Sequence, residues 1–183
     1  MSEKDMQDDN QGRKHMKITA ALATVCFLSG ATLASGADNG SAKFVGAKGE
    51  DAGKAELSKA PSGVLINVEI KGLPASQWVA FHVHQTGSCD AATHHESAGG
   101  HFNPDGKEHG YMAAKGPHAG DMPNQYVGAD GVLHAQVLNT SVTLDKGDKG
   151  IVGRALMIHA KPDDYKTQPT GAAGDRLACA VIE

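Results

Sequence analysis

The sequence is poor in aromatic residues and has no excess of positive charge. Phenylalanine, tyrosine and tryptophan make up 4% of the 183 residues, and 17 Lys and Arg side chains stand against 21 Asp and Glu. A surface that binds nucleic acid needs a basic stripe and aromatic rings on which bases can stack. We therefore expect no nucleic-acid partner.

The sequence also lacks an apolar segment long enough for a stable transmembrane helix. Residues 18–34 are apolar or small, but the run is shorter than the ~20 residues that a span requires. Basic residues at 13–17 precede it, and Ala34-Ser35-Gly36 supplies the small residues that a signal peptidase reads. We predict that residues 1–36 are an N-terminal extension with a cleavable signal peptide, within which Met16 is an alternative start.

Cysteine is scarce, and its three positions fit an exported protein. Cys26 lies in the predicted signal, which leaves Cys89 and Cys179 as one pair in an oxidising compartment. A bridge between them would close a loop of about ninety residues, worth roughly 4–5 kcal/mol in the chain-entropy account of disulfides. Two separate buried thiols are the alternative.

No stretch of useful length has the 3.6-residue apolar period of an amphipathic helix. Short segments bounded by glycine and turn residues alternate instead with a period of two, which indicates strands. We expect an all-β, antiparallel Greek-key sandwich or barrel of the immunoglobulin-like kind over residues 37–183, with two long functional loops at 85–127 and 163–174. The predicted strands are residues 41–47, 54–58, 64–70, 77–84, 132–138, 142–144, 154–159 and 176–182.

The stretch Phe81-His82-Val83-His84 holds the first candidate site. In a strand His82 and His84 share one face, while Phe81 and Val83 share the other. Two imidazoles about 6–7 Å apart along a strand can converge on one cation. Taken alone, two half-exposed strand histidines are the simpler interpretation.

Five further candidate ligands change that balance. Four of them follow the strand within forty residues, and the fifth comes from a distant strand: His101, His109, His118, Asp121 and His159. Histidine and carboxylate ligands suit zinc and copper, whereas magnesium and calcium prefer all-oxygen sites. Seven ligands for eight positions would suit two adjacent metal ions that share one bridging imidazolate.

With these ligands in this order, the sequence resembles the copper/zinc superoxide dismutases in their bacterial exported form. The resemblance covers nearly all of the chain after the signal, and its motifs are specific in combination. They are FHVH (81–84), GGHFNP (99–104), KEHG (107–110), GPHAGDMPN (116–124), GRALMIHA (153–160) and AGDRLACAVI (173–182).

The resemblance implies one copper ion and one zinc ion per subunit, joined through His101. It implies copper ligands at His82, His84, His101 and His159. It implies zinc ligands at His101, His109, His118 and Asp121.

Other residues receive roles from the same resemblance. Asp163 matches a carboxylate that hydrogen-bonds one ligand of each metal, although the adjacent Asp164 is an alternative. Arg176 matches an arginine that docks a small anion beside copper. Cys89 and Cys179 match the bridge within the subunit.

The implied activity is the disproportionation of superoxide to oxygen and hydrogen peroxide. The superoxide anion is the expected substrate, and Arg176 and His101 are the expected catalytic residues. The implied compartment is the periplasm, and the implied assembly is a monomer or a homodimer. A metal carrier without turnover and a structural adhesion-type sandwich are the rivals. A metal carrier needs no anion-docking arginine and no bridging histidine. A structural sandwich needs no histidines at metal-ligand spacing.

His94 and His95 remain outside this scheme. They could form an accessory metal-capture patch, but adjacent histidines often point apart. We therefore expect both side chains to be solvated.

Overall fold

The computed structural model describes residues 38–183 as strands joined by loops. The predicted signal peptide, its cleavage site after Gly36 and the alternative start at Met16 lie outside these residues. Within residues 38–183, no helix combines the length and the apolar character that crossing a bilayer demands.

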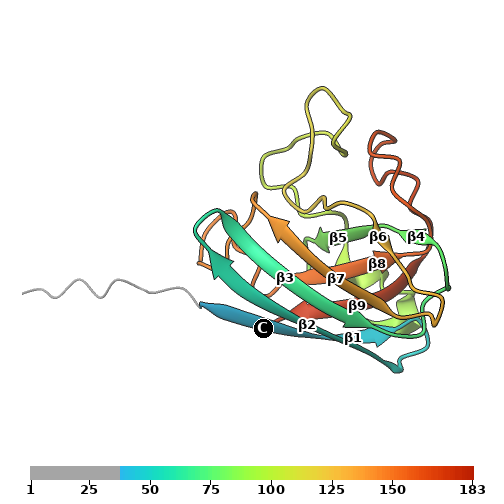
Figure 1. Ribbon diagram of the computed structural model, residues 1–183. Helices are drawn as coiled ribbons and strands as arrows, with labels where there is room; N and C mark the ends of the chain where they lie inside the picture. The colour runs from blue at the N-terminus through green and yellow to red at the C-terminus, as the bar shows by residue number, and fades with distance from the viewer. Residues whose placement is uncertain (1–37) are drawn as a thin grey trace, which may run out of the picture. The chain divides into compact units, whose positions relative to one another are not determined.

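One antiparallel sheet of seven strands organises this part of the chain (Figure 1). The sheet order is β5-β8-β9-β1-β2-β3-β7, and each neighbouring pair is antiparallel. The predicted all-β antiparallel class is thereby confirmed. The strands of the sheet are β1 (Asn39–Gly46), β2 (Asp51–Ala60), β3 (Gly63–Ile70), β5 (Phe81–His84), β7 (Leu133–Asn139), β8 (Ala155–His159) and β9 (Arg176–Ile182).

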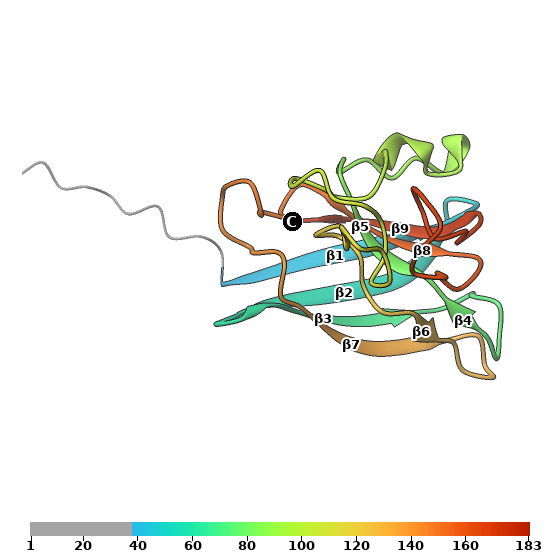
Figure 2. The same cartoon turned by 90° about the horizontal axis from the view of Figure 1, so that it is seen from above.

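The sheet curls, and its inner side holds the core (Figure 2). Strand β3 shows why one face of the sheet is apolar, because every second side chain along it is a large aliphatic one. Val64, Ile66, Val68 and Ile70 are buried, whereas Glu69 points outward. Burying each large aliphatic side chain contributes about 1.5–3 kcal/mol. The other strands add to the same cluster, among them Phe44, Leu57, Phe81, Leu133, Ile158 and Ile182.

Two of the predicted strands differ in the structure. The segment 77–84 is divided at Ala80 into β4 (Trp78–Val79) and β5, because β4 pairs with β6 (Gln125–Tyr126) in a separate small sheet. At the division the Ala80 N–H donates to the Lys161 carbonyl at 2.9 Å.

The prediction of a strand at residues 142–144 is wrong, because the structure has a turn there. Val142 and Leu144 are buried, which explains the alternating pattern, but only Thr143 forms a bridge, with Gly150. The Thr143 hydroxyl accepts a hydrogen bond from the Asp145 N–H at 3.0 Å, and this local turn replaces an extended ladder.

In Figure 1, the second predicted loop (red-orange) and the yellow part of the first both project above β5, β6 and β8. The first, after β5, also contains the short 3₁₀ helices η1 (Ala91–Thr93) and η2 (Glu96–Ala98). The second connects β8 to β9. A backbone hydrogen bond joins them directly, from the Met112 N–H to the Tyr165 carbonyl at 3.0 Å.

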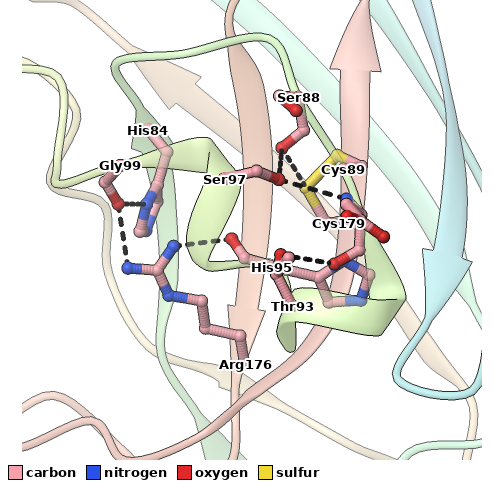
Figure 3. The surroundings of a disulfide bond; sticks show 10 residues. His84, Ser88, Cys89, Thr93, His95, Ser97, Gly99, Arg176 and Cys179 are labelled. Atoms are coloured by element: carbon pink, nitrogen blue, oxygen red, sulfur yellow. Dashed lines mark hydrogen bonds between the residues drawn. A yellow bond between two sulfur atoms is a disulfide. The ribbon is translucent and has the colours of Figure 1, made fainter.

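A disulfide between Cys89 and Cys179 ties the first loop to β9, with 5.5 Å between the two Cα atoms (Figure 3). The predicted bridge is therefore present, and the alternative of two separate thiols is excluded. The bridge spans a sequence separation of 90 residues, so it restricts a large part of the unfolded chain.

We expect the double variant Cys89→Ser/Cys179→Ser to lower the free energy of unfolding by about 4 kcal/mol, because the unfolded chain regains the entropy of the open loop. Urea unfolding of the metal-free protein would measure this loss. Wild-type protein in reductant serves as the matched control and should lose the same amount. A loss below about 1 kcal/mol would contradict the expectation.

Candidate metal centre

The first loop reaches the metal centre by pairing with the free edge of β5. The Val83 N–H donates to the Gly120 carbonyl and the Phe102 N–H donates to the Val83 carbonyl, both at 2.8 Å. A Cβ atom on Gly120 would lie 2.3 Å from the Val83 carbonyl oxygen, so only glycine permits this approach. Two isolated bridges result, which set His82 opposite Asp121 and His84 opposite His101.

These contacts bring all seven predicted ligands together in two groups, and His101 belongs to both. Within each group one ligand atom per residue lies within 4.8 Å of the others, and every member is buried. The first group is His82, His84, His101 and His159, and the second is His101, His109, His118 and Asp121. They are the copper and zinc sets that the resemblance implies.

The protonation of His84 and His159 shows that the first group suits a cation. Each ring directs Nδ1 at a backbone carbonyl, His84 at Gly99 (2.9 Å) and His159 at Gly174 (3.4 Å). A carbonyl only accepts, so Nδ1 carries the proton and Nε2 carries a lone pair. Burial also lowers the pKa of both rings well below the usual value, which keeps them neutral. Their Nε2 atoms face each other at 3.3 Å, where two lone pairs repel unless a cation binds both.

His82 and His101 complete the first group with two nitrogens that lack a protein partner. His82 donates from Nε2 to Asp163 Oδ2 at 2.8 Å, which leaves its buried Nδ1 unpaired. His101 directs Nδ1 at Asp121 Oδ1 at 3.0 Å, and its buried Nε2 is unpaired. A buried unpaired nitrogen is costly, and a copper ion at this point would bind both of these together with Nε2 of His84 and of His159.

The second group has the dimensions of a zinc site. Asp121 Oδ1 lies 3.0 Å from His101 Nδ1, 3.1 Å from His109 Nδ1 and 3.4 Å from His118 Nδ1. Ligand atoms about 2.0 Å from a tetrahedral zinc are about 3.3 Å apart, so the three distances fit. The second carboxylate oxygen accepts from the backbone N–H groups of Gly110 and His118, which fixes its orientation.

The charges of the second group also favour a cation. Although burial opposes it, the hydrogen bonds that His109 donates to Asp121 and Asp163 raise the pKa of His109 to about 9. Burial likewise disfavours ionisation of Asp121, yet hydrogen bonds from three imidazoles hold its pKa well below the usual range. The buried Asp121 carboxylate thus stays ionised among three imidazoles, and a metal cation at this point would replace their protons.

Asp163 connects the two groups. Its Oδ2 accepts from His82 Nε2 at 2.8 Å and its Oδ1 from His109 Nε2 at 3.0 Å, with no exposed side-chain surface. Asp164, the alternative in the sequence, instead accepts from the N–H groups of Lys166 and Thr167 in a local turn. Asp163 is therefore the residue that sets one imidazole in each group.

Arg176 lies beside the first group because β9 places it opposite His159 in the register with β8. Its guanidinium donates to the His95 carbonyl (2.7 Å) and to the Gly99 carbonyl (2.8 Å), and Glu96 lies 3.3 Å away (Figure 3). The Gly99 oxygen also accepts from His84, so one carbonyl orients the arginine and a predicted copper ligand.

One expectation failed at His95. His94 is exposed as predicted, but His95 is fully buried at a positive φ of 59°, and neither of its ring nitrogens has a hydrogen-bond partner. Sequence spacing gave no signal for this burial, because it depends on how the loop after β5 packs against the rest of the chain. Gln168, which holds the backbone of His109, was also missed, since one glutamine in a polar loop carries no pattern.

We expect His95→Phe to raise the free energy of unfolding by about 1 kcal/mol at pH 8, since two unpaired nitrogens leave the interior. Burial lowers the pKa of His95 below 6.5, so the unfolded state binds the proton better. The gain should therefore grow as the pH falls below about 6.5. Chemical unfolding at pH 8 and pH 5 would measure both, with exposed His134→Phe as the control. A loss of stability at either pH would refute this account.

Comparisons with known proteins identify the family. The family described as "Copper/zinc superoxide dismutase (SODC)" matches residues 39–182. Superoxide dismutase [Cu-Zn] 2 of Aquifex aeolicus is 52% identical over 145 residues, which cover 77% of this chain and 84% of that protein.

Two solved structures show the same relationship. A SOD-like protein from Bacillus subtilis has 34% identity and a TM-score of 0.74 over 80% of this chain and 98% of the other. The Cu/Zn superoxide dismutase from Brucella abortus has 30% identity and a TM-score of 0.66 over 79% and 99%. The family match, the sequence identity and the two ligand groups lead to one conclusion: this chain belongs to the copper/zinc superoxide dismutase family.

Proposed function

We propose that the protein disproportionates superoxide to oxygen and hydrogen peroxide at a copper site that His101 joins to a zinc site. The observation that carries the proposal is the position of the His101 ring. Its Nδ1 faces Asp121 in the second group, and its Nε2 faces the first group without a protein partner. A carrier for a single metal would have no use for a ligand shared in this way.

The chemistry needs one electron moved in each of two half-reactions. One superoxide loses an electron and leaves as oxygen, and a second gains an electron and two protons and leaves as hydrogen peroxide. His82, His84, His101 and His159 would hold copper, which would supply the one-electron exchange, and the second group would hold zinc, which has no redox chemistry and would add fixed positive charge.

The protein's own residues bind the anion and manage protons. Arg176 presents a guanidinium beside the first group, and its two backbone contacts hold it in place. His101 offers Nε2 as the atom on which a proton can be held close to the bound anion. The neighbouring Glu96, whose carboxylate is exposed to solvent 3.3 Å from the guanidinium, offsets part of this positive charge.

We propose further that the protein works after export, in the periplasm. The sequence of the N-terminal segment supports this proposal, with its basic patch, apolar run and small residues. The Cys89–Cys179 bridge also supports it, because disulfides persist in oxidising compartments outside the cytoplasm. The assembly we expect is a monomer or a homodimer.

N-terminal sequencing of protein from the periplasmic fraction should find Ala37 as the first residue. Intact Met1 or Met16 there would refute the signal.

The decisive test follows superoxide decay directly by stopped-flow absorbance. Protein from Ala37, loaded with one copper and one zinc, should approach the diffusional ceiling of ~10⁸–10⁹ M⁻¹s⁻¹, for which superoxide dismutase is itself a standard example. We expect His159→Ala to lose at least about a hundredfold, because it removes one first-group ligand. Stoichiometric metal binding with decay no faster than buffer would favour the carrier instead.

Arg176→Ala should lower the rate about tenfold and flatten its dependence on ionic strength, because the anion loses its local positive partner. Arg176→Lys is the matched control and should retain most of the salt dependence. Both variants should bind copper and zinc like the wild type. An unchanged rate and salt slope in Arg176→Ala would remove this residue from substrate capture.

A further inference from the structure

We propose that Gln168 is a positioning residue for the zinc ligand His109. The proposal rests on the zinc site of the proposed function, and it concerns how the second loop holds a ligand that the first loop supplies. Gln168 is not a candidate ligand, and its side chain touches only backbone atoms.

The side-chain amide of Gln168 pairs with both backbone groups of His109. Its Oε1 accepts from the His109 N–H at 2.8 Å, and its Nε2 donates to the His109 carbonyl at 2.8 Å. The second Nε2 hydrogen goes to the Lys166 carbonyl at 3.0 Å, within the same loop. All three bonds agree on which amide atom is oxygen, so the amide has a single orientation.

The second loop thus holds His109 at two points. Gln168 fixes the backbone, and Asp163 fixes the ring through Nε2 at 3.0 Å. With both ends set, Nδ1 is directed at Asp121 Oδ1 at 3.1 Å, and a zinc ion would take the place of the proton between them. Preorganising a ligand in this way lowers the entropy lost on binding the ion.

The first loop makes an equivalent contact with the backbone of the second loop. Asn124, in the first loop, accepts from the Asp163 N–H at 2.8 Å and donates to the Asp163 carbonyl at 2.9 Å. Each loop therefore uses one amide side chain to hold the backbone of a residue in the other loop. The two residues held in this way, His109 and Asp163, are hydrogen-bonded to each other.

The two loops approach each other closely at this point. A Cβ atom on Gly171 would lie 1.9 Å from Asp163 Oδ1 and 2.6 Å from His109 Nε2, and a Cβ on Gly110 would lie 2.0 Å from the Tyr165 carbonyl oxygen. The second loop therefore passes directly over the pair. Gln168 itself is exposed, so its truncation leaves the core intact and acts on the loop contact alone.

His109 belongs to the second group and not to the first, so the loss of Gln168 should affect zinc more than copper. The experiment loads the protein with one copper and one zinc and follows the release of each metal to a chromogenic chelator at pH 7. We expect Gln168→Ala to release zinc at least about tenfold faster than the wild type, with copper release within about twofold.

Two further variants sharpen the result. Gln168→Glu keeps the acceptor for the His109 N–H but loses both donors, so its zinc release should fall between wild type and Gln168→Ala. Gln136→Ala is the matched control, because Gln136 also makes a side-chain hydrogen bond but lies on β7, bonded to Asn67. It should release both metals like the wild type.

Cobalt(II) bound in place of zinc gives a second readout, since its visible absorption reports ligand geometry. Gln168→Ala should alter these bands, whereas Gln136→Ala should not. Zinc release within twofold of wild type, or equal acceleration of both metals, would overturn the proposal. Because neither readout requires turnover, the proposal and the dismutase activity can fail separately.

Discussion

The centre depends on one constraint: an imidazole ring has two nitrogens, and the protein commits one of them to an acceptor of its own. Carbonyl oxygens take Nδ1 of His84 and His159, and Asp163 takes Nε2 of His82 and His109. The remaining nitrogen of each ring then has a fixed direction, along which it can bind a metal ion once it carries no proton. Burial keeps the first-group rings neutral, so the lone pairs persist at neutral pH.

The sheet makes this constraint possible by leaving one strand edge open. Strand β5 is the edge of the seven-stranded sheet, and its outer backbone groups pair with single residues of the first loop rather than with another long strand. An edge that would otherwise invite association with another chain is thereby covered. Its alternation still serves the core, because Phe81 and Val83 point inward while His82 and His84 point to the loop.

Sequence patterns could predict the strands and the ligands, but not the contacts that support them. The two-residue spacing of His82 and His84 is fixed by strand geometry alone, and the all-β class follows from alternation such as that of β3. Val142 and Leu144 misled because a turn can bury alternate residues as a strand does. Asp163 could not be separated from Asp164, since that choice depends on how the second loop folds over His109.

The same limit applies to single side chains in the loops. Both His94 and His95 were expected to be solvated because adjacent histidines often point apart, yet the His95 ring is buried. Its burial is a tertiary effect with no local code.

The carbonyl of Gly99 has a consequence of its own. It is the common acceptor for His84 Nδ1 at 2.9 Å and for the Arg176 guanidinium at 2.8 Å. Because the two side chains come from different strands, β5 and β9, this one oxygen is where their orientations are coupled. A substitution that displaced it would disturb the proposed docking charge and the metal-facing imidazole together.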